Sequence, residues 1–328
     1  MKILITGGAG FLGLRLASAL LDQGEFAGES IAELTIADLI PPPGGQRKDA
    51  RIRVMTGDLL EQCSALARMR FDLVFHLAAA VSSACEADFD LGMRSNVDGI
   101  RSLLEALRVS GACPRLVFAS SAAVFGGEAA LPLPAVVSDA TLPAPQSSYG
   151  IQKFIGEQLV ADYSRRGYID GRSLRLMTVV VRPGRPNAAA SSFLSSIIRE
   201  PLRGEAAVCA APLETRVALA SPRRTVQALL RVAEADRSLL GGRTAINMPA
   251  LSVSVREMLD ALERFGGAAA RARVELRVDP TIERIVGSWP AAFDAVRAGR
   301  LGLSPDPDFP SIVEEFLRDE DARRKGEI

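Results

Sequence analysis

Three glycines at equal spacing follow the first apolar run of the chain. Ile3–Ile5 has the pattern of a buried strand, and Gly7, Gly10 and Gly13 come soon after it, around the start of an amphipathic segment. Glycines in these places permit a tight turn, let the backbone approach a pyrophosphate and let a helix pack closely on the strand. The free N–H groups at the start of such a helix attract phosphate groups. The pattern therefore predicts a dinucleotide-binding loop at the beginning of an α/β domain.

The first half of the chain alternates short apolar runs with longer helical patterns. Apolar residues at helical spacing predict helices at 11–23, 91–110 and 148–166. Because each apolar run between them is continuous, the strands are expected to form a parallel sheet covered on both faces. We expect an α/β fold, with a Rossmann-type doubly wound parallel sheet and a smaller C-terminal α+β substrate domain. The predicted strands are residues 3–5, 34–37, 52–55, 73–75, 116–119 and 175–181.

The composition of the chain changes after Pro183, where a loop rich in alanine and serine begins. We therefore predict an NAD-binding Rossmann domain at 1–183 and a substrate-binding domain at 184–328, with 221–236 folding back onto the first. A last amphipathic helix is expected at 312–318, followed by a charged, frayed tail.

The charge balance excludes several classes of partner. Lysine plus arginine and aspartate plus glutamate both number 39, so the formal net charge is +0. This balance favours neither nucleic acid nor an anionic membrane surface as a partner. No apolar stretch approaches the ~20 residues of a membrane span, and the N-terminal run is too short for a signal peptide. Four cysteines without metal-ligand spacing indicate free thiols, so we expect a cytoplasmic protein.

Asp38 ends the second predicted strand. A carboxylate at this place can accept hydrogen bonds from both hydroxyls of the adenosine ribose, and it repels a 2′-phosphate. Arg47 and Lys48 could serve a 2′-phosphate, but they follow three consecutive prolines and are expected in a solvated loop. The sequence therefore favours NAD over NADP.

A tyrosine and a lysine, Tyr149 and Lys153, are spaced so that a helix places them on one face. An ammonium beside a phenol stabilises the phenolate and lowers its pKa. A tyrosine tuned in this way can take a proton from an alcohol while hydride leaves the carbon. Ser120 and Ser121 end the fifth predicted strand, at the sheet edge where ligands bind in such folds. Of the two, Ser121 is preferred as the residue that holds the substrate oxygen.

Together these motifs resemble the extended short-chain dehydrogenase/reductase superfamily, which includes the NAD-dependent epimerases and dehydratases, over nearly the whole chain. The segments that carry the resemblance are 6–13, 57–59, 76–79, 96–97, 120–126 and 149–153. One departure is Phe125, where many relatives have a tyrosine. The chain has a single histidine, His76, and this count excludes a multi-histidine metal site. His76 is expected to be a packed strand residue.

The resemblance implies a role for each matching residue. Asp58 and Leu59 would contact adenine, Asn96 would help to organise the proton relay, and Pro183 would pack near the nicotinamide. The catalytic residues would be Ser121, Tyr149 and Lys153. The residues that would bind NAD are Gly7, Gly10, Phe11, Leu12, Gly13, Asp38, Asp58, Leu59, Leu77, Ala78, Ala79, Asn96, Tyr149, Lys153 and Pro183.

The second half of the chain is similar to the D-erythronate dehydrogenase family at 179–193, 197–202, 221–224 and 288–290. This resemblance implies NAD-dependent oxidation of the 2-hydroxyl of a small sugar acid, D-erythronate to 2-dehydro-D-erythronate. Such a substrate needs a cation for its carboxylate and polar groups for its hydroxyls. Arg182 is expected to brace the end of its strand instead. Besides Ser121 and Tyr149, the candidates for substrate binding are Arg185, Asn187, Ser191, Ser192 and Arg223.

Three other functions are weighed against this one. A nucleotide-sugar epimerase acting on a UDP-sugar is the main alternative, because it shares the first half. A dehydratase is disfavoured because Ala122 and Ala123 stand where such enzymes of the superfamily carry an acidic pair. A redox-sensing regulator that binds NAD without turnover is disfavoured because Tyr149 and Lys153 are both present.

A homodimer is also expected. The helical segments 91–110 and 148–166 carry apolar residues on more than one face, and one face of each must cover the sheet. The remainder could pair with a second copy, and the superfamily resemblance implies a four-helix seam of this kind. The apolar residues concerned include Leu103, Leu107, Ile155 and Leu159.

Overall fold

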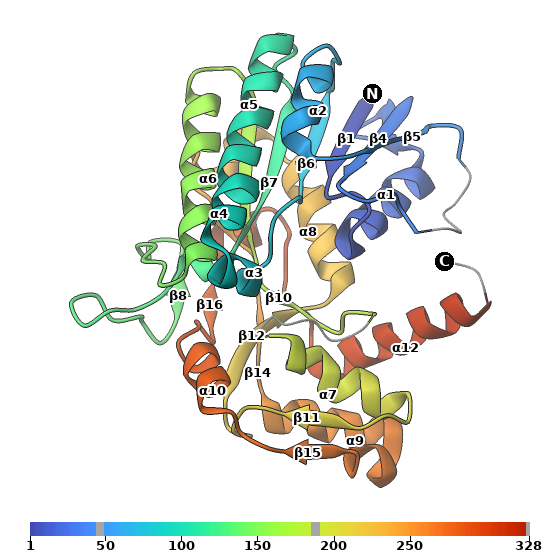
Figure 1. Cartoon of the computed structure of the whole chain (residues 1–328), viewed down its shortest axis with the longest axis vertical. Coiled ribbons are helices and arrows are strands. Elements are labelled where there is room, and N and C mark those ends of the chain that lie inside the picture. Colours follow the sequence, from blue (N-terminus) through green and yellow to red (C-terminus); the bar gives the residue numbers. More distant parts are fainter. Residues whose placement is uncertain (44–48, 185–190, 326–328) are drawn as a thin grey trace.

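The computed structural model describes residues 1–43, 49–184 and 191–325 (Figure 1). Its centre is a parallel sheet of seven strands in the order β13-β9-β7-β6-β1-β4-β5. The chain runs outward from β1 to β5 and then returns to β6 on the other side of β1, which is the topological switch point of a doubly wound sheet. The predicted α/β fold class is confirmed. The strands are β1 (Lys2–Thr6), β4 (Glu33–Asp38), β5 (Ile52–Thr56), β6 (Leu73–His76), β7 (Arg115–Ser121), β9 (Asp170–Leu176) and β13 (Ile246–Asn247).

Alternate residues of the central strand β1 face opposite layers of helices. Ile3 and Ile5 belong to a core cluster that includes α1 and α8, whereas Leu4 belongs to a cluster with α2, α5 and α6. Because successive side chains of a strand point to opposite faces, helices cover both sides of the sheet. Figure 1 shows α2, α5 and α6 gathered on one side. The covering helices are α1 (Phe11–Gln23), α2 (Leu59–Leu66), α5 (Gly99–Ser110), α6 (Ser148–Arg165) and α8 (Pro222–Glu234).

A second core cluster lies below the sheet in Figure 1 and is built from later parts of the chain. Its sheets are β10-β12-β14 and β11-β15, flanked by α7 and α9. The chain also returns to the main sheet, because α8 contacts β7 and β9, and β13 pairs with β9. The domain boundary at 183 stays a prediction. The elements are β10 (Thr178–Val179), α7 (Ser192–Leu202), β11 (Ala207–Cys209), β12 (Arg216–Ala220), β14 (Leu251–Ser254), α9 (Val255–Arg271), β15 (Val274–Leu276), α10 (Pro280–Gly287) and α12 (Phe309–Lys325).

Short elements complete the described part of the chain. Within it, no helix is long and apolar enough to cross a bilayer. The short elements are β2 (Glu25–Phe26), β3 (Glu29–Ser30), α3 (Ser82–Ala87), α4 (Phe89–Gly92), β8 (Val137–Ser138), β16 (Phe293–Asp294) and α11 (Val296–Arg300).

The sixth predicted strand is placed wrongly at 175–181. Strand β9 begins at Asp170 and ends at Leu176, and the chain then joins a different sheet as β10. The early half of β9 looks too polar for a central strand. Its charges are paired, however, because Arg172 donates to the Asp170 carboxylate over 2.7 Å and to the carbonyl of Val232 over 2.6 Å.

Two helices also differ from the prediction. The segment expected as one helix at 91–110 begins as α4, passes through a π-helical turn at Met93–Asp98 and continues as α5. The last helix, expected at 312–318, is α12 and extends to Lys325. Of the residues predicted to fray, those up to Lys325 are helical. Asp319 pairs with Arg15, and Glu320 accepts from Arg203 over 2.8 Å, which holds this part of the helix in place.

Candidate active site

The glycine loop runs from the end of β1 to the start of α1. Gly7 has a φ of +69°, and a Cβ there would lie 2.6 Å from the amide nitrogen of Ala78. A Cβ on Gly13 would lie 2.4 Å from the carbonyl oxygen of Gly7. Gly10 is the N-cap of α1 and supplies no side chain to cap it, so N–H groups of the first turn remain for a ligand. The loop fits the pyrophosphate of a dinucleotide.

Asp38, at the end of β4, lies against this loop. One carboxylate oxygen accepts a hydrogen bond from the amide of Ala9 over 2.9 Å. This bond orients the side chain beside the loop and uses one of its several lone pairs, so the carboxylate can still accept from a ribose. Arg47 and Lys48, which could instead bind the 2′-phosphate of NADP, lie outside the described residues.

Asp58 caps α2, where its side chain accepts from the amide of Leu60 over 2.9 Å. It also accepts from Arg94 over 2.6 Å, and this hydrogen bond lowers the pKa of the Asp58 carboxyl. Leu59, the first residue of α2, is half-buried. A contact of Asp58 and Leu59 with adenine stays a prediction.

Asn96 lies in the π-helical turn and is buried. Its side chain accepts from the amide of Ala80 over 2.8 Å and donates to the Gln152 side chain over 2.8 Å. Nδ2 also lies 3.2 Å from the sulfur of Cys85. Asn96 therefore ties the segment after β6 to helix α6, beside Lys153, and its part in a proton relay stays a prediction.

The structure brings the three predicted catalytic residues together. Tyr149 opens helix α6, Lys153 lies one turn further on, and the Lys153 ammonium is 5.7 Å from the centre of the Tyr149 ring. Ser121 ends β7 and is hydrogen-bonded to Tyr149. Ser120 turns inward instead, because it is buried and donates to Glu157 over 2.5 Å. The geometry supports the preference for Ser121 over Ser120.

The expected lowering of the pKa of Tyr149 by Lys153 is wrong for the protein alone. Loss of solvent raises the pKa of Tyr149 to about 12, although the hydrogen bond with Ser121 acts in the opposite direction. Burial also lowers the pKa of Lys153 to about 8, and its ammonium donates to the carbonyl of Ala119 over 2.9 Å. Desolvation therefore dominates the pKa of both groups. A further cation next to the phenol would lower its pKa again.

His76 is a packed strand residue, as predicted. Its Nδ1 is hydrogen-bonded to the Thr6 hydroxyl over 2.6 Å, and its ring stacks on Phe118. Burial lowers the pKa of His76 to about 3, so the imidazole is neutral near pH 7.

The candidates for binding the substrate are spread over two regions. Arg185 and Asn187 lie outside the described residues. Arg223 opens α8 with an exposed side chain, and its Nε is 3.5 Å from the carboxylate of Glu315. This carboxylate would compete with a substrate for the guanidinium, so a substrate role for Arg223 stays a prediction.

Arg182 braces the chain as expected, and it does so through its backbone. Its carbonyl accepts from Arg199 over 2.6 Å, and its amide donates to Ser195 over 3.1 Å. Its side chain reaches the hydroxyl of Ser191 over 3.4 Å. In the described part of the chain no carboxylate pairs with Arg182. Its guanidinium, which directly precedes Pro183 in the chain, is therefore a third candidate for binding the substrate carboxylate, besides Arg185 and Arg223.

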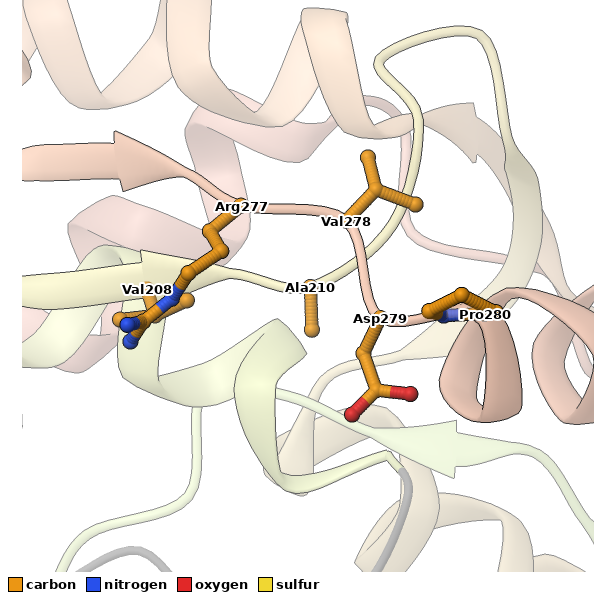
Figure 2. Close-up of a pocket in the computed structure, with 6 residues that line it drawn as sticks. All are labelled: Val208, Ala210, Arg277, Val278, Asp279 and Pro280. Atoms are coloured by element: carbon orange, nitrogen blue, oxygen red, sulfur yellow. The ribbon is translucent and has the colours of Figure 1, made fainter.

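One depression of the surface lies elsewhere, in the smaller unit (Figure 2). It has a volume of about 430 Å³ and lies beside β11, β15 and the start of α10. None of the predicted site residues lines it, so it is distinct from the candidate active site. Its lining residues are Val208, Ala210, Arg277, Val278, Asp279 and Pro280.

Fold and site together define a class of protein. Glycines that admit a pyrophosphate lie at the switch point of a doubly wound sheet. On the same sheet a serine ends β7, next to a tyrosine and a lysine of helix α6. That combination is typical of an enzyme that moves hydride to or from a nicotinamide dinucleotide.

Comparison with known proteins is in agreement. Residues 3–247 match the NAD dependent epimerase/dehydratase family, and the chain belongs to this family. The protein is an NAD-dependent oxidoreductase, and NAD is its cofactor, as the sequence predicted.

Its relatives match over almost their whole length. A D-erythronate dehydrogenase of Cupriavidus necator is 51% identical, with 97% of this chain and 98% of the relative covered. A D-erythronate dehydrogenase of Haemophilus influenzae is 41% identical over 97% and 99% of the two chains. The crystal structure of a nucleoside-diphosphate-sugar epimerase from Agrobacterium tumefaciens is 40% identical, with a TM-score of 0.91 over 98% and 94% of the chains.

Proposed function

We propose that the protein oxidises the 2-hydroxyl of D-erythronate to 2-dehydro-D-erythronate and reduces NAD. The observation that carries this proposal is the 51% identity with the Cupriavidus necator D-erythronate dehydrogenase, which extends over both halves of the chain. The first half holds the cofactor residues and the second half holds candidate cations for a sugar acid. A shared nucleotide-binding half alone would not distinguish the substrate.

The chain's own residues divide the chemistry among them. Bound NAD supplies the acceptor for hydride from the carbon beside the carboxylate. The glycine loop holds the pyrophosphate, and Asp38 holds the adenosine ribose. Ser121 holds the reacting hydroxyl, Tyr149 takes its proton as the general base, and the Lys153 ammonium stabilises the phenolate that this requires.

Substrate orientation needs one cation near the reacting carbon. Arg185, Arg223 and Arg182 are the candidates, and a guanidinium can bind a carboxylate through two parallel hydrogen bonds. Truncation to alanine of the residue that holds the carboxylate should lower kcat/KM on the acid by on the order of 10²-fold. Affinity for NAD should change little, because the cofactor is held by the other half of the site.

An epimerase acting on a UDP-sugar is the second candidate, because the Agrobacterium tumefaciens structure, with a TM-score of 0.91, is named a nucleoside-diphosphate-sugar epimerase. Purified protein should be incubated with NAD and a panel of four-carbon sugar acids, with NADH absorbance as the readout. We expect NADH from D-erythronate. Interconversion of a UDP-sugar without net NADH, and no turnover of the acids, would instead establish the epimerase.

The proposed compartment is the cytoplasm. All four cysteines are free thiols in the structure, and such thiols persist in a reducing environment. Cell fractionation should recover the protein with a cytoplasmic marker enzyme, and recovery with the periplasm or membrane would contradict the proposal.

A further inference from the structure

We propose that Glu157 is a positioning residue of the active site, which fixes helix α6 against the ends of β7 and β9 and supplies the negative charge that keeps Lys153 protonated. The inference rests on the role of Lys153 in the proposed function. Glu157 is not among the site residues predicted from the sequence. Its signal was its spacing, because Tyr149, Lys153 and Glu157 follow one another at four-residue intervals along one helix face.

The Glu157 carboxylate makes three hydrogen bonds in the interior. One oxygen accepts from the Ser120 hydroxyl over 2.5 Å and from Arg175 Nε over 2.8 Å, and the other accepts from Arg175 Nη2 over 2.7 Å. Only 2% of Glu157 and 6% of Arg175 are exposed. A bidentate ion pair without solvent holds its partners in one geometry.

The partners of Glu157 are the strand residues next to the catalytic serine. Ser120 on β7 and Arg175 on β9 are directly opposite one another in the sheet register, and the next pair is Ser121 and Leu176. One carboxylate from α6 therefore holds both strands one residue before Ser121. Movement of α6 would separate Tyr149 from Ser121, so the clamp maintains the contact between these two residues.

The same helix face controls the charge of Lys153. Burial favours the neutral amine, and two acidic groups, Cys85 first and Glu157 second, oppose this effect on the pKa of Lys153. The other ionisable groups around Lys153 are Cys85 on α3, His76 on β6 and Tyr149 on its own helix. All three are neutral near pH 7 when the site is empty, because burial raises the pKa of Cys85 and Tyr149 and lowers that of His76. Glu157 therefore supplies the negative charge, and Arg175 partly offsets it.

Stability alone does not explain such a pair. A buried ion pair pays for the desolvation of both charges, and apolar residues of similar volume often stabilise a core equally well. Arg175 also continues the polar network, because it reaches Asn247 on β13 over 3.3 Å and lies over the ring of Phe125. The network thus reaches Phe125, in the segment that follows Ser121.

Lysine-selective NMR tests the inference without any substrate. The chain has four lysines, Lys2, Lys48, Lys153 and Lys325, so ¹³C-lysine labelling gives few signals, and Lys153→Met assigns the one of interest. Wild-type Lys153 should titrate with a pKa of about 8. In Glu157→Gln the midpoint should fall by roughly one unit. In Arg175→Met it should rise, because Glu157 then loses its competing cation.

The matched control is Asp170→Asn, which removes a carboxylate from an arginine at the opposite end of β9. It should leave the Lys153 midpoint unchanged. An unchanged midpoint in both Glu157→Gln and Arg175→Met, or an equal fall in Asp170→Asn, would overturn the inference. If Glu157→Gln does not fold by circular dichroism, Arg175→Met decides the question through the sign of its shift.

Kinetics then separate this inference from the proposed function. With a substrate that the wild type oxidises, Glu157→Gln should lower kcat by roughly tenfold and move the alkaline limb of its pH profile to lower pH, with KM for the acid little changed. If the wild type oxidises no sugar acid, the proposed function fails while the NMR titration still reports on Glu157. A normal kcat and an unmoved limb would overturn the positioning role.

Discussion

Desolvation dominates the chemistry of single residues in this site. Tyr149 and Lys153 are each displaced toward their neutral forms by burial. We expect such a site to become active when a bound ligand supplies a compensating charge. The positive nicotinamide ring of NAD has the sign that favours the phenolate, so binding of cofactor and activation of Tyr149 are expected to be coupled.

Tyr149→Phe removes the phenolic proton acceptor and little else. Positioned proton transfer typically contributes roughly 10²–10⁴-fold, so we expect kcat to fall by about that factor while NAD binding, measured by calorimetry, is nearly retained. Tyr163→Phe, on the same helix but bonded to Glu105, is the matched control and should keep its rate. More than half the wild-type rate in Tyr149→Phe would refute the assignment. Lys153→Met should weaken both turnover and NAD binding.

We expect the choice between NAD and NADP to depend on Asp38. We expect kcat/KM for NAD to exceed that for NADP, because the carboxylate repels the 2′-phosphate. Asp38→Asn should lower the ratio of kcat/KM for NAD to kcat/KM for NADP, because it removes the charge while it keeps an acceptor for the Ala9 amide. Equal constants in the wild type would show that Asp38 does not select the cofactor.

His76 makes the fold sensitive to acid. Its pKa is about 3 in the folded protein, against roughly 6.5 when unfolded, so the unfolded state binds more protons between these values. The contribution of His76 to the free energy of unfolding is therefore fully present above about pH 6.5. It decreases by up to about 1.4 kcal/mol per pH unit as the pH falls toward 3. Denaturant titrations at pH 7 and pH 5 should show that the free energy of unfolding decreases less between these pH values in His76→Gln than in the wild type. Equal losses would contradict this contribution of His76.

At the scale of elements, close approach between β1 and α1 creates the cofactor loop. Gly13→Ala would place a methyl group 2.4 Å from the Gly7 carbonyl. We expect a loss of on the order of 2 kcal/mol of stability together with weaker NAD binding. Gly299→Ala in α11 is the control, because nothing lies within 4 Å of its added Cβ, and it should leave NAD affinity unchanged. Wild-type affinity in Gly13→Ala would show that the loop can move apart without loss.

At the scale of the whole molecule, the helices α5 and α6 contain the proposed dimer seam. Leu103 and Leu107 are unavailable to it, because both are buried in the core beneath α5. Ile155 and Leu159 keep partial exposure, and Ile151 is 47% exposed. The prediction of a homodimer therefore depends on α6 more than on the leucines of α5.

Light scattering at micromolar concentration should give the mass of a dimer. Ile151→Asp should shift the mass toward a monomer, whereas Val296→Asp, at a similarly exposed position on α11, should not. A monomeric wild type would refute the seam.

The features of this molecule that could be predicted from the sequence are those defined by residues close together in the chain. Helix α1 has the predicted bounds Phe11–Gln23, because a glycine loop before it and an apolar period within it are both local signals. The cofactor glycines and the spacing of Tyr149 and Lys153 are local in the same sense, since a turn or one helical repeat is enough to define them.

Only the tertiary structure decided the questions that depend on distant partners. The start of β9 was misread because the charges of Asp170 and Arg172 are balanced by groups of other elements. The preference for Ser121 over Ser120, which stays a prediction, is supported by Glu157, because this residue of another element accepts a hydrogen bond from Ser120. The pKa of Tyr149 moved against expectation for the same reason, because burial is the sum of all surrounding elements and no spacing along the chain records it.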